Sequence, residues 1–67
     1  MFQEIDENFY ILLNNVAGVK LVKENDKYIW LFYTNHPEPL KSKVFDSEEE
    51  AKIWFKNIKY NYYRTKE

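Results

Sequence analysis

The stretch Lys27-Tyr-Ile-Trp-Leu-Phe-Tyr-Thr34 is predicted to form a β-strand that is apolar on both sides. Successive side chains of a strand point to opposite faces of the sheet. One face of this strand carries Tyr28, Trp30 and Phe32, and the other carries Ile29, Leu31 and Tyr33. A strand with one solvated face would alternate apolar with polar residues. We therefore expect that something covers each of these two faces.

The chain has 67 residues, the size of one small domain spanning residues 1–67. Two tryptophans, six tyrosines and five phenylalanines against one glycine and two prolines favour a packed domain over a disordered chain. The sequence has no cysteine, which excludes disulfides and thiolate metal sites and fits a cytoplasmic protein. It also shows neither a signal peptide nor an apolar run of about 18 residues, so we expect no membrane span.

The clearest hairpin joins residues 19–24 to residues 27–34. Asn25 and Asp26 form its two-residue turn, because both accept positive φ more readily than most residues. In that register Glu24 faces Lys27, and opposite charges beside the turn suit cross-strand neighbours. A C-terminal helix, described below, is expected to cover one face of this hairpin, and we call the other face the outer sheet face. On it the register places Lys20, Val22, Ile29, Leu31 and Tyr33.

Three more strands are expected, at residues 1–6, 9–13 and 40–45. Gly18 is expected to mark a bulge or bend before the long hairpin. In the last strand, apolar matching directs Lys41 and Lys43 to the outer sheet face and Leu40 and Val44 to the opposite side.

A helix is expected to begin after Asp46, because Ser47 and Glu50 have the spacing of a capping box. One apolar stripe of the helix should pack on the inner face of the sheet, with Trp54 near Trp30. The members of that stripe are Ala51, Trp54, Phe55, Ile58 and Tyr62. The helix should end near Tyr63 and be followed by a mobile tail, residues 64–67. These expectations define an α+β fold: an antiparallel β-meander of about five strands, then one C-terminal helix on one face.

Catalysis is not expected. His36 is the only histidine and lies in a proline-bounded loop, without cysteine or a second histidine to complete a metal or nucleophile site. There is no glycine-rich phosphate loop and no metal-ligand spacing. The sequence therefore predicts a non-enzymatic protein without a cofactor or metal.

Two apolar surfaces should remain after the helix has covered the inner face. They are the outer sheet face, with Lys20, Val22, Ile29, Leu31, Tyr33, Lys41 and Lys43, and the back of the helix, with Ile53 and Tyr60. Contiguous apolar patches of this kind mark interfaces. Association with another protein, or a homodimer formed through the outer face or an edge strand, would cover the first surface. Curling of the sheet into a partial barrel is the structural alternative.

Two other functions use the same residues. Tyr33 with Lys20, Lys41 and Lys43 would suit stacking of a single-stranded nucleic acid, although the net charge of −1 argues against a dedicated duplex-DNA binder. A nucleotide-sequestering protein holding its ligand between subunits is the third candidate. The acids at residues 46–50 would also suit a basic groove on a protein target.

The segments Phe9-Tyr-Ile-Leu-Leu-Asn-Asn-Val16 and Phe45-Asp-Ser-Glu-Glu-Glu-Ala-Lys-Ile-Trp54 resemble those of short accessory proteins from low-GC bacteria, their phages and plasmids. That class includes anti-defence inhibitors of the anti-CRISPR kind. The resemblance implies a binding role and assigns no residues to a site. The most concrete form of such a role is a stoichiometric inhibitor of a host defence complex, encoded by a phage or mobile element.

Overall fold

The computed structural model describes residues 1–66, without the side chains of residues 64–66. Its elements are β1 (Phe2–Asp6), β2 (Phe9–Leu12), a 3-10 turn η1 (Leu13–Asn15), β3 (Gly18–Glu24), β4 (Lys27–Tyr33), β5 (Leu40–Lys41) and α1 (Glu48–Lys66). The predicted α+β class, with antiparallel strands followed by one C-terminal helix, is confirmed. The helix continues past its expected end at Tyr63. The last residue of the predicted mobile tail, Glu67, lies outside the described residues, as do the three side chains before it.

The β3–β4 hairpin has the predicted register, in which Glu24 faces Lys27 and Leu21 faces Trp30. Its turn residues Asn25 and Asp26 have φ of 51° and 62°. Positive φ at both central residues is what a type I′ turn requires, and such a turn matches the right-handed twist of the strands. Of the bulge or bend expected at Gly18, the bulge is wrong, because this glycine pairs regularly with Tyr33 at the start of β3.

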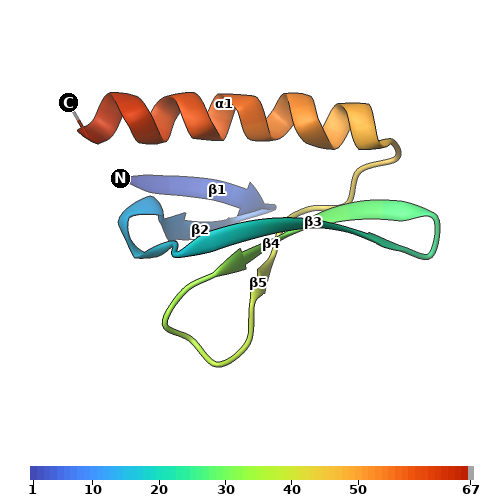
Figure 1. The fold of residues 1–67 in the computed structure, drawn as a ribbon, viewed down its shortest axis with the longest axis horizontal. Helices are drawn as coiled ribbons and strands as arrows, with labels where there is room; N and C mark the ends of the chain where they lie inside the picture. Colours follow the sequence, from blue (N-terminus) through green and yellow to red (C-terminus); the bar gives the residue numbers. More distant parts are fainter. Residues whose placement is uncertain (67) are drawn as a thin grey trace.

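The strands form two sheets and not one continuous meander: β1 pairs with β2, and β3, β4 and β5 pair in that order. The chain leaves the first sheet at Leu13, where η1 replaces the end of the predicted second strand. The backbone N–H of Lys43 donates to the carbonyl of Ile5, 2.6 Å away, and joins β1 to the segment after β5. Figure 1 shows β1 between α1 and β2, so β2 is the strand farther from the helix.

The fifth strand is shorter than the expected residues 40–45. After Lys41 the Ser42 hydroxyl accepts a hydrogen bond from the Trp30 N–H at 2.9 Å, taking the place of a backbone carbonyl. The Ser42 N–H still donates to the Trp30 carbonyl at 2.9 Å, and backbone pairing beyond Ser42 resumes at Phe45, which pairs with Tyr28. The intervening residues leave the strand geometry, and Val44, expected on the core side, is 61% exposed. A side chain that competes for a ladder donor thus ends the strand early.

The core lies between α1 and the inner faces of both sheets. Its buried members are Ile5, Ile11, Leu13, Trp30, Phe32, Phe45, Ala51 and Ile58. Trp30 stacks on Phe55 with ring centroids 4.4 Å apart, and its indole N–H donates to the Ala51 carbonyl at 2.9 Å. Trp54 packs against Phe32 and Phe45, and the ring stacked on Trp30 is that of the next residue, Phe55. The predicted helix stripe is confirmed, because all of its members are buried in the core or packed against it.

The start of the helix is fixed by its cap. The Ser47 hydroxyl accepts a hydrogen bond from the Glu50 N–H at 3.1 Å, as the capping pattern predicts. Just before it, Asp46 forms an ion pair with Lys27, with a distance of 2.6 Å between Nζ and Oδ1. This pair ties the start of α1 to the turn end of β4.

Candidate functional site

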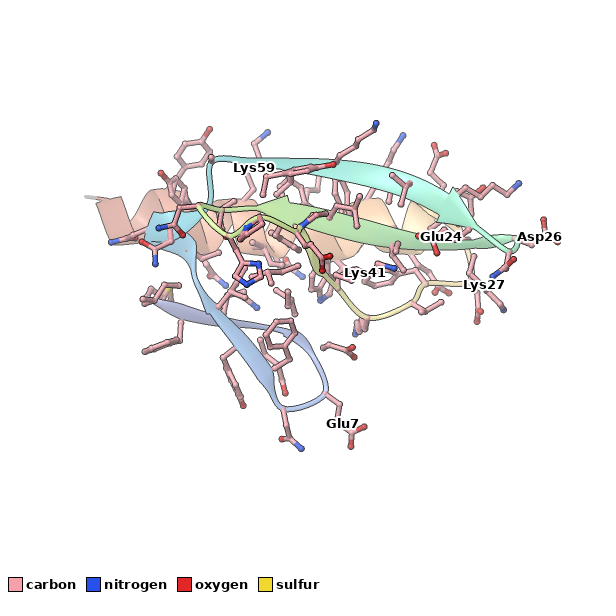
Figure 2. All side chains as sticks on the ribbon, turned by 90° about the horizontal axis from the view of Figure 1, so that it is seen from below. Glu7, Glu24, Asp26, Lys27, Lys41 and Lys59 are labelled. Carbon is pink, nitrogen blue, oxygen red and sulfur yellow. The ribbon has the colours of Figure 1, made fainter. Side chains whose placement is uncertain are left out.

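The outer sheet face is covered by its own chain more than the sequence suggested. Ile29, at its centre, is only 6% exposed although it is not part of the core between sheet and helix. Lys41 faces Leu31 from β5, and Glu24 faces Lys27 from β3. Lys41 and Glu24 form an ion pair, with 3.9 Å between Lys41 Nζ and Glu24 Oε2, and this pair therefore crosses the central strand β4 at the level of Ile29. Figure 2 shows both side chains on the face turned away from α1.

The other predicted residues of this face differ in exposure. Val22 and Leu31 are half-buried, and Lys20 and Tyr33 are exposed. The apolar area open to a partner is therefore concentrated at Tyr33, at the end of β4 nearest the 34–39 loop. The contiguous apolar patch expected around Ile29 is therefore thin, because Ile29 is buried and Val22 and Leu31 are half-buried.

Lys43 does not join Lys41 on the outer sheet face. The interruption at Ser42 turns it toward the β1–β2 hairpin, where it lines a hollow with Glu4, Asp6 and Glu7. Its Nζ also lies 5.4 Å from the centre of the Phe45 ring. A three-lysine surface around Tyr33 is therefore not assembled, since one of the three cations lies among hairpin acids.

The back of the helix carries the predicted pair Ile53 and Tyr60, and both side chains are exposed. Ile53 lies in a shallow hollow with Glu48, Glu49, Lys52 and Lys56. Lys52 and Glu48 pair at 2.9 Å across one helical turn, and this contact lowers the pKa of Glu48 and raises that of Lys52. This surface is a charged helix face with isolated apolar residues, as is ordinary for a solvated helix.

The largest exposed apolar side chains of the strands lie elsewhere, on the β1–β2 hairpin. Phe2 faces Leu12 across the hairpin, and Tyr10 is the next residue of β2 on the same side. Their exposed fractions are 68% for Phe2, 54% for Tyr10 and 39% for Leu12. The opposite side of the hairpin supplies Ile5 and Ile11 to the core. We call the exposed set Phe2, Tyr10 and Leu12 the hairpin aromatic face.

A groove of about 330 Å³ runs beside this face, between β2 and the 34–40 segment. Its lining residues are Phe2, Phe9, Tyr10, Ile11, Leu12, Asn15, Thr34, Asn35, His36 and Leu40. Four consecutive residues of β2, Phe9–Leu12, contribute to it. Neighbouring strand residues point to opposite faces, so a groove that touches all four runs along the edge of the strand. We call it the β2 edge groove.

Acids surround the turn end of the β2 edge groove. Asp6 is the cross-strand partner of Phe9, and Glu7 follows it in the turn, where Figure 2 shows its side chain at the hairpin tip. Glu4 faces Tyr10 across the hairpin, and Glu38 lies in the loop that forms the other wall. Lys43 is the cation that lines a hollow with the three hairpin acids. The surroundings of the groove are therefore net negative.

The apolar residues of β1 indicate this surface in the sequence, but they fit two different arrangements. Phe2 and Ile5 fall on opposite faces of β1, and either could have been the buried one. Ile5 is the buried one, and the Lys43 N–H donates to its backbone carbonyl, which places the chain after Lys41 beside β1. No local pattern in residues 1–13 records that long-range contact.

Within the described residues, no three His, Asp or Glu side chains are grouped as a metal ion would require. The helix of residues 48–66 is not apolar enough over a membrane-spanning length to cross a bilayer. Comparison of the chain with protein-family models, with characterised proteins and with solved structures finds no match.

Proposed function

We propose that this protein acts by stoichiometric, non-enzymatic binding to another protein through the hairpin aromatic face. The observation that supports this is the exposure of Phe2, Tyr10 and Leu12 together on one side of a hairpin whose other side contributes Ile5 and Ile11 to the core. Aromatic side chains are the usual anchors of protein interfaces, because they bury a large area at a small cost in conformational entropy. The resemblance to phage and plasmid accessory proteins supports a small cytoplasmic inhibitor as the most concrete form of this function.

The charges near the aromatic residues favour a protein over a nucleic acid. Single-strand binders place cations beside the stacking rings, to contact the phosphates. Here Glu4 is the neighbour of Tyr10, and the outer-face lysine Lys41 is paired with Glu24. An acidic surround repels a polyanion and attracts a basic protein surface.

Site-specific photocrosslinking tests this proposal. A photoreactive phenylalanine analogue replaces Tyr10 in one variant and Tyr60 in a matched control. Both tyrosines are exposed, but Tyr10 lies in β2 and Tyr60 in α1. In lysate of the organism that encodes the protein, we expect adducts of defined mass from position 10 and not from position 60. Adducts from position 60 alone would move the binding surface to the back of the helix. Adducts from neither position would contradict protein binding.

A further inference from the structure

We propose that the β2 edge groove takes up an extended, lysine- or arginine-bearing segment of a partner protein, which pairs with β2 as an added strand. This inference rests on the proposed protein-binding function and specifies its mode. It follows from three features of the described chain: the edge of β2, the shape of the groove and the charge around it.

The first feature is an edge with unpaired backbone groups. In the described part of the chain β2 pairs with β1 alone. The Leu13 N–H donates to the Met1 carbonyl, at 3.1 Å. Amides alternate in direction along a strand, so the N–H groups of Leu12 and Tyr10 point away from β1, toward the edge groove. Such a row of donors and acceptors is a template for another strand.

The second feature is a groove that suits a chain segment better than a globular surface. It has β2 on one side and the 34–40 segment on the other, including His36 and Leu40. At about 150–250 Å² per aromatic side chain, the exposed fractions of Phe2 and Tyr10 amount to roughly 200–300 Å². A stable interface between globular proteins buries about 800 Å² on each partner. The exposed aromatic area is therefore large enough to anchor a short peptide but not a globular partner. Such a peptide gains the rest of its affinity from main-chain hydrogen bonds.

The third feature is the charge of the surroundings. Asp6 is the cross-strand partner of the lining residue Phe9, Glu7 follows Asp6, and Glu38 lies between the lining residues His36 and Leu40. These neighbouring acids leave a net negative field beside the groove. The same acids would meet their own copies if two molecules associated through this region. A segment with lysine or arginine at alternate positions would place its cations beside these carboxylates and its other side chains against the aromatic residues.

The test uses the full-length protein and a blocked synthetic peptide of about seven residues, the length of an ordinary strand. The peptide alternates lysine with valine or threonine. Two derivatives are N-methylated, one on odd and the other on even amides, and a third has glutamate in place of lysine. Binding is followed by NMR titration of the amides of Phe9–Leu12, up to about 1 mM peptide, the weak end of measurable affinity.

We expect saturable binding of the lysine peptide and slower hydrogen exchange at the Tyr10 and Leu12 amides. One N-methylated derivative should lose binding while the other keeps it, because only alternate amides of an added strand face β2. The glutamate peptide should bind more weakly, and salt should weaken the lysine peptide. Reversal of charge in Glu7→Lys should reduce affinity by roughly two- to tenfold, and Glu49→Lys on the helix should not.

Several results would overturn the inference. Equal binding of both N-methylated derivatives would exclude strand addition, and preference for glutamate over lysine would exclude a basic segment. Protection of the Tyr10 and Leu12 amides that rises with protein concentration and without peptide would identify a second copy as the occupant. Any of these results, combined with specific crosslinks from position 10, would leave protein binding intact and reject only this mode.

Discussion

Ser42→Ala removes a hydroxyl that serves as part of the backbone ladder. Ser42 is buried, its Oγ accepts from the Trp30 N–H at 2.9 Å, and the hydroxyl donates to the Lys43 carbonyl at 2.8 Å. Alanine keeps the shape of the side chain nearly unchanged but leaves the Trp30 N–H without its acceptor. An unsatisfied buried donor costs about 1–3 kcal/mol. For a domain of this size the whole free energy of unfolding is about 3–10 kcal/mol.

Urea unfolding followed by tryptophan fluorescence measures this loss. We expect the midpoint to fall while the slope m stays constant, because the surface exposed on unfolding does not change. Thr34→Ala is the matched control, since the Thr34 hydroxyl also accepts a backbone N–H, that of His36, but at an exposed site. That substitution should cost less than about 0.5 kcal/mol. Hydrogen exchange at the Trp30 amide should accelerate in the Ser42 variant. If the two variants were equally stable and Trp30 exchange were unchanged, the ladder role of Ser42 would be refuted.

Other substitutions test other parts of the structure. Gly18→Ala should raise the free energy of unfolding by about 0.4–1 kcal/mol, because its φ is not positive and a Cβ there meets no atom within 4 Å; a lower midpoint in urea would contradict this. Ile29→Ala should cost about 2–5 kcal/mol, as for a core residue, and exposed Tyr33→Ala much less; equal losses in thermal unfolding would show that the chain does not cover Ile29. The hydrogen bond from Lys27, and then its charge, lower the pKa of Asp46. The pair therefore stabilises the fold above the unfolded pKa near 3.8, and this contribution is lost as pH falls through the folded value. The stability of Lys27→Gln should thus depend less on acid pH, and an identical pH profile would refute the pair's contribution.

Much of the fold follows from local signals in the sequence. The turn at Asn25 and Asp26 fixes the register of the long hairpin, and the Ser47 cap fixes the start of the helix. Both depend on residues a few positions apart, and the inward-facing helix stripe depends on simple periodicity. Such features can be predicted because the residues that cause them are neighbours in the chain.

The candidate site was harder to locate, because long-range contacts decide which apolar residues are covered. An ion pair between β3 and β5 crosses the strand over Ile29, and Lys43 leaves the outer face because Ser42 interrupts the strand. The alternation of residues 40–45 predicted a regular strand and could not reveal that interruption. The hairpin aromatic face was missed for the same reason: what Phe2 contacts is set by distant parts of the chain.

The two hairpins also differ in how the protein should assemble over time. The β3–β4 hairpin needs only sequence neighbours and a turn whose two φ angles already suit it, so its contacts form at a small loss of chain entropy. The β1–β2 hairpin depends on the Lys43–Ile5 hydrogen bond and on a core that α1 must complete. We expect substitutions at the turn of β3–β4 to slow folding, and substitutions in the β1–β2 hairpin mainly to accelerate unfolding. The strand proposed to receive a partner, β2, would then be among the last elements to reach its native packing during folding and among the first to lose it during unfolding.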